Sequence, residues 1–178
     1  MSERNPHGGV QMHIEIGGYR PGAIGRVAEM HADYYHRHWG FGLFFEAKVA
    51  TELAEFLCRF EKERDGFWTL LNGDRIEGAV AIDGRKAADE GAHLRWFIVS
   101  AELRGGGWGR RLMTEAVSFC DRRSYRRIGL WTFAGLDQAR HLYESFGFHL
   151  VSQGEGEQWG TRVVEQRFER DREQAVLP

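Results

Sequence analysis

RGGGWG, residues 104–109, separates an apolar run at 94–99 from an amphipathic segment that starts near Arg110. Glycines let the backbone approach a ligand closely and adopt positive φ angles. The first free amides of a helix, together with the helix dipole, favour an anion at the same place. The stretch therefore predicts an anion-binding loop at the junction of a strand and a helix.

The length and composition indicate one packed domain. With 178 residues, of which 42% are hydrophobic and 13% aromatic, the chain can build one core but not two comfortable ones. We expect a single domain over residues 10–170, with flexible tails at 1–9 and 171–178. The net charge of −2 provides no long-range field that would select a polyanion, so nucleic acid is not the expected partner.

The cysteines and the N-terminal segment bear on the compartment. Cys58 and Cys120 each fall in a helical apolar stripe, so we expect buried, reduced thiols and no disulfide. No apolar run approaches the roughly 20 residues that span a bilayer, and residues 1–9 lack the pattern of a signal peptide. The sequence predicts a cytoplasmic protein without a membrane partner.

The spacing of apolar residues predicts a mixture of strands and helices. Helices are expected at 24–35, 45–60, 110–122 and 139–146, and strands at 10–16, 67–71, 76–82, 94–99, 128–133, 148–152 and 161–168. The Asn72-Gly73 pair between two apolar runs is typical of a hairpin turn. Hairpins give antiparallel pairs and strand–helix–strand units give parallel ones, so the fold class is mixed α/β, or α+β.

Two familiar phosphate-binding loops do not match. A P-loop, GxxxxGK[ST], places a lysine on the phosphates, and none follows this stretch. A dinucleotide fingerprint, GxGxxG, would need glycine in place of Arg110. Another kind of phosphate ligand is therefore expected.

The pattern R/Q-x-x-G-x-G/A is matched by Arg104, Gly107 and Gly109, and A-x-x-x-Y-x-x-x-G-F is matched by residues 139–148. In these two motifs the chain resembles the GCN5-related N-acetyltransferase (GNAT) superfamily. More narrowly, the segments LRWFIV, GRRL, LWT and ARHLYESFGF are similar to the acetyltransferase half of bacterial fusions to a MarR-type winged-helix repressor. The resemblance extends from about residue 12 to 168.

This resemblance implies the acyl-CoA N-acyltransferase fold, a mostly antiparallel sheet flanked by helices and splayed at a bulge in the strand that ends at Val99. Acetyl-CoA would enter the splayed cleft, with its pyrophosphate on the loop amides and its pantetheine along the strand edge. The implied cofactor-binding residues are Phe97, Ile98, Val99, Arg104, Gly105, Gly106, Gly107, Trp108, Gly109 and Arg110. The basic residues at 122–127 are interpreted as a solvated helix end, with contact to the 3′-phosphate as the alternative.

Aminolysis of a thioester needs an oxyanion donor, a base and an acid. The Val99 N–H is the candidate donor, and Tyr143 is the candidate acid because a phenol can return a proton to the leaving sulfur. Glu46 and His31 are the candidate bases, acting directly or through water. Each has a structural alternative: core packing for Tyr143 and His31, and the helix dipole for Glu46.

The implied function is direct transfer of an acetyl group from acetyl-CoA to a primary amine of a small molecule, a protein lysine or an N-terminus. A non-catalytic acyl-CoA sensor is the alternative, and a closed acceptor side would distinguish it. The aromatic link at 39–45 is expected either to wall the acceptor site or to pack in the core or at a homodimer contact. His31, His36 and His38 do not form a complete ligand set, so no metal is expected.

Two departures from the family pattern affect the cleft. Ser100-Ala101 stands where Asp-Pro is frequent, and this change should alter only a turn. Leu136 stands where many relatives have Asn, which removes a polar contact near the cofactor chain.

Overall fold

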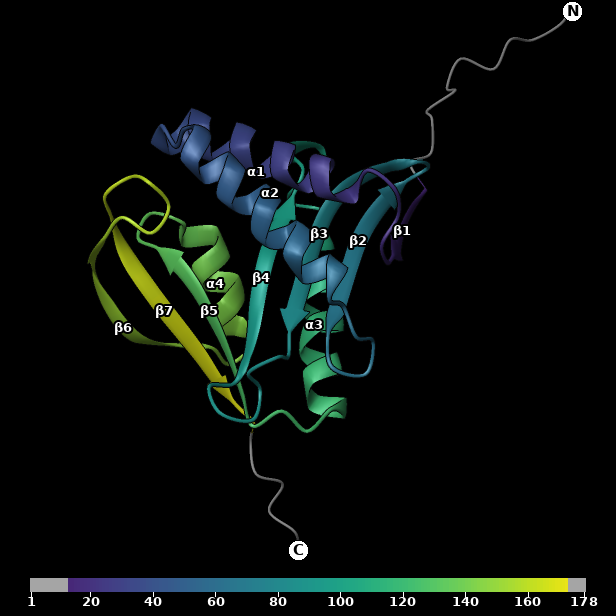
Figure 1. Cartoon of the computed structure of the whole chain (residues 1–178), viewed down its shortest axis with the longest axis vertical. Coiled ribbons are helices and arrows are strands. Elements are labelled where there is room, and N and C mark those ends of the chain that lie inside the picture. The colour runs from purple at the N-terminus through teal and green to yellow at the C-terminus, as the bar shows by residue number, and fades with distance from the viewer. Residues whose placement is uncertain (1–12, 173–178) are drawn as a thin grey trace, which may run out of the picture.

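A seven-stranded mixed sheet with helices on both faces organises residues 13–172, the part of the chain that this computed structural model describes (Figure 1). The helices are α1 (Ala23–Trp39), α2 (Leu43–Cys58), α3 (Trp108–Arg122) and α4 (Asp137–Ser145), and a 3-10 turn covers Ala101–Leu103. The strands are β1 (Ile14–Gly17), β2 (Gly66–Asn72), β3 (Arg75–Asp83), β4 (Ala92–Val99), β5 (Arg127–Phe133), β6 (His149–Gly156) and β7 (Val163–Asp171).

The strand order is β1-β2-β3-β4-β5-β7-β6, and only the β4–β5 pair is parallel. This arrangement confirms the expected mixed, mostly antiparallel sheet. Helices α1 and α2 cover one face, and α3 and α4 cover the other (Figure 1). Each face therefore has its own apolar core, with Leu53 and Phe56 of α2 in one and Leu112 and Met113 of α3 in the other.

The sheet opens between β4 and β5. The two strands are in register only at Ala92 with Ile128 and His93 with Gly129, close to the ends where both strands begin. Beyond these residues the strands diverge (Figure 1). The expected splay is therefore present, and it leaves the facing edges of β4 and β5 without a partner strand over most of their length.

A bulge in β4 accompanies the splay. Ala81 pairs with Arg95 and Ala79 pairs with Ile98, so two residues of β4, Trp96 and Phe97, lie opposite Val80 alone. Trp96 has a φ of 49°, in the left-handed region. Because of the bulge, the consecutive residues Arg95 and Trp96 lie on the same face of the sheet. Arg95 pairs with Glu52 of α2, and Trp96 packs on Phe56 of the same helix.

Most element boundaries agree with the sequence prediction. Gly73 adopts a φ of 57° in the β2–β3 turn, as the Asn-Gly signal predicts. Residues 10–12 of the first expected strand lie outside the described residues, as do the tails at 1–9 and 173–178. Strand β7 runs to Asp171, one residue beyond the expected domain, and α2 ends at Cys58. Within the described residues no helix combines the length and the apolarity that crossing a membrane requires.

The prediction for the cysteines is half right. Cys120 is buried in α3, and burial raises the pKa of its thiol to about 12. Cys58, the last residue of α2, is exposed instead of buried. The last buried residue of α2 is Phe56, so the apolar face of the helix ends before Cys58.

Candidate active site

The glycine loop presents its backbone to open space at the start of α3. Gly105 and Gly107 both have a φ of 79°, and Gly107 is the N-cap residue of α3. A Cβ atom built on either glycine would meet nothing within 4 Å. The amides of the first helical turn have no acceptor inside the helix, so they are free to bind a ligand above the loop. This geometry fits a phosphate group.

Gly109 joins the loop to the cleft. A Cβ atom at this position would lie 3.2 Å from the tip of the Phe97 ring and 3.8 Å from a methyl group of Val99. The first turn of α3 therefore packs closely on the end of β4, at the residues that the sequence assigned to pantetheine. The loop and the strand edge form one continuous surface.

Arg104 holds this surface together and does not point over the loop. Its Nε donates to the Val99 carbonyl at 3.1 Å, and its guanidinium carbon lies 4.1 Å from the centre of the Tyr34 ring. The side chain thus connects α1, the end of β4 and the loop. The structure therefore gives Arg104 contacts that position the loop and the strand end.

The cations nearest the loop are on the first turn of α3. Arg110 donates to the Ser145 hydroxyl at 3.0 Å, and Arg111 stacks on Trp108 at 4.4 Å. Arg111 was not among the predicted site residues, although its place directly after an anion-binding loop was a usable signal. The basic group at 122–127 begins at the far end of this 15-residue helix, about 22 Å along its axis, so contact with the loop is not supported.

A cavity of about 340 Å³ occupies the opening between β4 and β5. Its walls come from both strands, from α1 and α2, from Leu136 and Tyr143 beside and on α4, and from Gln158 and Trp159 between β6 and β7. Phe97 lines the cavity as well as contacting the loop. The glycine loop and the cavity are therefore neighbours.

Tyr143 lies at the wall of this cavity. Its ring packs edge-on against Phe97, with ring centres 6.0 Å apart, and it also contacts Phe148 and Phe168. Burial raises the pKa of its phenol well above the ordinary value, and Tyr35 contributes to the increase. Among the residues that the structure describes, none forms a hydrogen bond with its hydroxyl. Tyr143 thus carries a proton at neutral pH that it can donate, while the raised pKa makes its phenol a weaker acid than an ordinary tyrosine.

His31 also lines the cavity, and its ring is held in one tautomer. Its Nδ1 lies 2.8 Å from the Val27 carbonyl, which can only accept, so Nδ1 carries the hydrogen and Nε2 keeps a free lone pair. Burial lowers its pKa to about 4. The imidazole is therefore neutral at pH 7, and it is a weak base because its pKa lies far below the working pH.

Glu46 is exposed in the first turn of α2 and is not among the residues that line the cavity. The carboxylate that does line it is Glu52, further along the same helix, which pairs with Lys48 and with Arg95 of β4. Glu52 was not among the predicted site residues, because a charged residue is expected on the solvent-facing side of such a helix. Its spacing, seven residues after Phe45 and three after Val49, places it on the inward face of the helix.

His93 is a second functional candidate that the sequence did not reveal. It lines the cavity where β4 and β5 last pair, and burial, aided by the charge of Arg95, lowers its pKa to about 4.

The aromatic residues of the link at 39–45 lie in two different environments. Phe45 lines the cavity, whereas Phe41 packs in the core against Phe133 at 5.4 Å.

Leu136 is the N-cap residue of α4 and contributes an apolar side chain to the cavity wall, at the position where the family resemblance led us to expect Asn. No side chain caps this helix. Within residues 13–172, no group of three or more His, Cys, Asp or Glu side chains is arranged to hold a metal ion.

Comparison with known proteins places this geometry among acetyltransferases. The uncharacterized N-acetyltransferase MJ1207 of Methanocaldococcus jannaschii is 24% identical over 119 residues, which cover 65% of this chain and 53% of the relative. The chain spans about half the length of the curated relatives it matches.

Two solved structures share the fold. A GNAT-family acetyltransferase from Staphylococcus aureus superposes with a TM-score of 0.71 at 16% identity, over 89% of this chain and 99% of that one. The protein yncA of Salmonella typhimurium, solved with its cofactor acetyl-CoA, gives a TM-score of 0.69 at 14% identity, over 92% of this chain and 96% of that one. Since the acetyltransferase (GNAT) family also matches residues 26–148, which is well over half of the sequence, this chain belongs to that family.

Proposed function

We propose that this protein transfers the acetyl group of acetyl-CoA directly to a primary amine. The observation that carries the proposal is the continuity of the glycine loop with the cavity, through the contact between Gly109 and Phe97. A loop suited to a pyrophosphate therefore leads to a buried phenol, that of Tyr143. The acetyl-CoA bound by yncA supports the choice of cofactor.

The roles of the chain's own residues follow from their positions. When bound, acetyl-CoA supplies an acetyl thioester, which an amine can attack. The amides of residues 107–110 hold the pyrophosphate, with Arg110 and Arg111 beside it, and the open edge of β4 at 97–99 receives the pantetheine. Tyr143 donates a proton to the departing sulfur, and the Val99 N–H stabilises the developing oxyanion. His31, which lines the cavity, and Glu46, which would act through water, remain the predicted bases.

The acceptor side favours an enzyme over a sensor. The cavity wall on the α2 side carries Lys48, Glu52 and Arg95, so polar groups are available to a second substrate. A sensor needs no such acceptor side. The similarity to MarR-fusion acetyltransferases, a homodimer and a cytoplasmic location remain predictions from the sequence.

The loop assignment is tested by a pair of glycine variants. Gly107→Val and Gly73→Val both place a branched side chain at a positive φ, 79° and 57°, with nothing within 4 Å of the new Cβ. Both should lose comparable stability from backbone strain, roughly 1–2 kcal/mol. Only Gly107→Val fills the space above the loop, so only this variant should lose acetyl-CoA affinity in calorimetric titrations.

The transfer itself is tested by CoA release from acetyl-CoA across a panel of amines, amino acids and lysine peptides. Equal loss of acetyl-CoA affinity in both glycine variants, or none in Gly107→Val, contradicts the loop assignment. Acetyl-CoA binding without release for any acceptor supports the sensor.

A further inference from the structure

A second cavity adjoins the first on the same face of the sheet. It measures about 340 Å³ and lies next to the first cavity, at the end of the sheet where β4 and β5 begin. His93, Leu130 and Trp131 line both cavities, so the two share a wall and form one elongated depression. Their combined size would hold a ligand of one to three amino-acid residues.

Positive charge predominates in this depression. The cationic side chains that line the two cavities are Lys48, Arg59, Arg85, Lys86, Arg95 and Arg167. The anionic ones are Glu52, Asp83 and Glu90. Both lining histidines, His31 and His93, are neutral at pH 7 because burial lowers the pKa of each to about 4. Six cations thus face three anions, and one of the six, Arg167, is paired with Glu169 outside both cavities, so two positive charges remain in excess.

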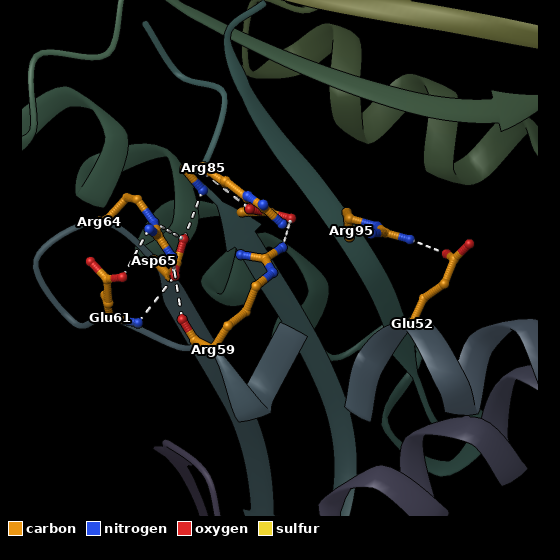
Figure 2. Close-up of polar contacts among 9 residues, drawn as sticks. Glu52, Arg59, Glu61, Arg64, Asp65, Arg85 and Arg95 are labelled. Carbon is orange, nitrogen blue, oxygen red and sulfur yellow. Dashed lines mark hydrogen bonds and ion pairs between the residues drawn. The ribbon is translucent and has the colours of Figure 1, made fainter. Parts of the chain in front are cut away.

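One of these positive charges lies at the wall of the first cavity. Lys48 and Arg95 both pair with the single carboxylate of Glu52, so this group of three retains one positive charge. Figure 2 shows the pair between Arg95 and Glu52. The Arg95 guanidinium also lies 4.1 Å from the centre of the Trp96 ring. The contact with the Trp96 ring and the ion pair with Glu52 hold the Arg95 guanidinium in one orientation. A guanidinium that is already oriented binds a carboxylate well.

The second cavity has a further cation available. Arg59 pairs with Asp83, and Lys86 pairs with Glu90 at 2.6 Å. Arg85 lies beside Asp83, to which its backbone N–H donates at 3.1 Å, but its guanidinium makes no ion pair with any residue in the described part of the chain (Figure 2). An anionic group in this cavity would therefore meet an unneutralised guanidinium.

We propose that the acceptor is a small amine that also carries at least one carboxylate, such as an amino acid or an acidic di- or tripeptide. Lys48 and Arg95 bind the carboxylate next to the reacting amine, and the second cavity receives any further acidic group. Glu52 orients the two cations. This inference rests on the proposed acetyl transfer, since it names the substrate class of the same site.

The test compares amines that differ only in a carboxylate. L-lysine and cadaverine form one such pair, and L-glutamate and 4-aminobutyrate form another. Binding is measured by calorimetry with CoA present, and acetylation is measured by CoA release from acetyl-CoA. The member with the additional carboxylate should bind about tenfold more tightly or better, which is the usual range for a charge-assisted hydrogen bond.

Three variants locate the effect. Lys48→Gln and Arg95→Gln should each remove most of the preference, raising the Kd or KM of the carboxylate-bearing member and leaving its partner unchanged. Lys62→Gln makes the same charge change at an exposed residue outside both cavities and should keep the preference. Thermal melts check that each variant is folded. If Arg95→Gln is destabilised by the loss of its contact with Trp96, the carboxylate preference of Lys48→Gln alone tests the proposal.

Cadaverine binding as tightly as lysine, or a preference that survives both Lys48→Gln and Arg95→Gln, overturns the proposal. Acetylation of amines regardless of a carboxylate would overturn it while leaving acetyl transfer intact. A carboxylate preference in binding without any CoA release would instead count against the proposed function. Transfer confined to lysine peptides and absent from the free amines also contradicts it.

Discussion

Acidification should destabilise this protein through His31. Burial lowers the pKa of His31 to about 4 in the folded chain, whereas the unfolded chain titrates near the ordinary value of 6.5. Between these two values the unfolded chain binds a proton that the folded chain excludes. The free energy of unfolding therefore increases with pH across this window. The stability that His31 contributes by staying neutral is fully present above pH 6.5 and is lost as the pH falls towards 4.

The magnitude follows from the two pKa values. A difference of one pKa unit corresponds to 1.36 kcal/mol, so excluding the proton from His31 costs roughly 3 kcal/mol of stability near pH 4. His93 has a similarly lowered pKa and should contribute a comparable amount. Together the two losses are a large part of the roughly 5–15 kcal/mol that stabilises a typical domain.

Urea denaturation between about pH 7.5 and about pH 4.5 measures this effect. His31→Asn keeps an N–H donor for the Val27 carbonyl and cannot titrate, so its unfolding free energy should depend less steeply on pH than that of the wild type. His93→Gln is the matched control and should remove the other part of the slope. A full wild-type slope in His31→Asn would refute the assignment of a buried, neutral imidazole.

Three further variants test other parts of the structure. Tyr143→Phe keeps the ring contacts with Phe97, so acetyl-CoA affinity should stay constant while kcat falls about a hundredfold; an unchanged kcat removes the phenol from the mechanism. Arg104→Leu breaks the bond to the Val99 carbonyl and should lower the unfolding free energy by about 1 kcal/mol, measured in urea. Gly42→Ser adds a side-chain cap to α2 at an extended, open position, and should raise the Tm by about 1 °C in a thermal melt; a lower Tm would contradict the open geometry.

The sequence was sufficient for the elements whose signals are local. RGGGWG predicted the loop because positive φ angles at Gly105 and Gly107 require glycine, and Asn72-Gly73 predicted the hairpin turn for the same reason. The insertion of β7 between β5 and β6 was not predictable in this way. Strand order depends on contacts between residues far apart in the chain, which apolar spacing does not encode.

The site divides similarly. Tyr143 was identified because it belongs to a recognisable pattern, and the structure brings it to the cavity with His31. Glu52 and Arg95 meet only because the β4 bulge turns two consecutive side chains toward α2, a tertiary event without a sequence signal of its own. Glu46 was chosen by residue type alone, whereas the carboxylate that lines the cavity, Glu52, is found only when the helical face is taken into account; the catalytic role of Glu46 stays a prediction.

The sparse pairing of β4 with β5 has a mechanical consequence. Two registered residue pairs join a sheet half of four strands to a half of three, so the halves can flex about Ala92 and His93 as two plates on a short hinge. Amides on the open edges should exchange with deuterium faster than those of the β5–β7 ladder. A ligand that contacts both β4 and β5 across the opening would restrain this motion. It should slow amide hydrogen exchange in both halves of the sheet and raise the force needed to separate them.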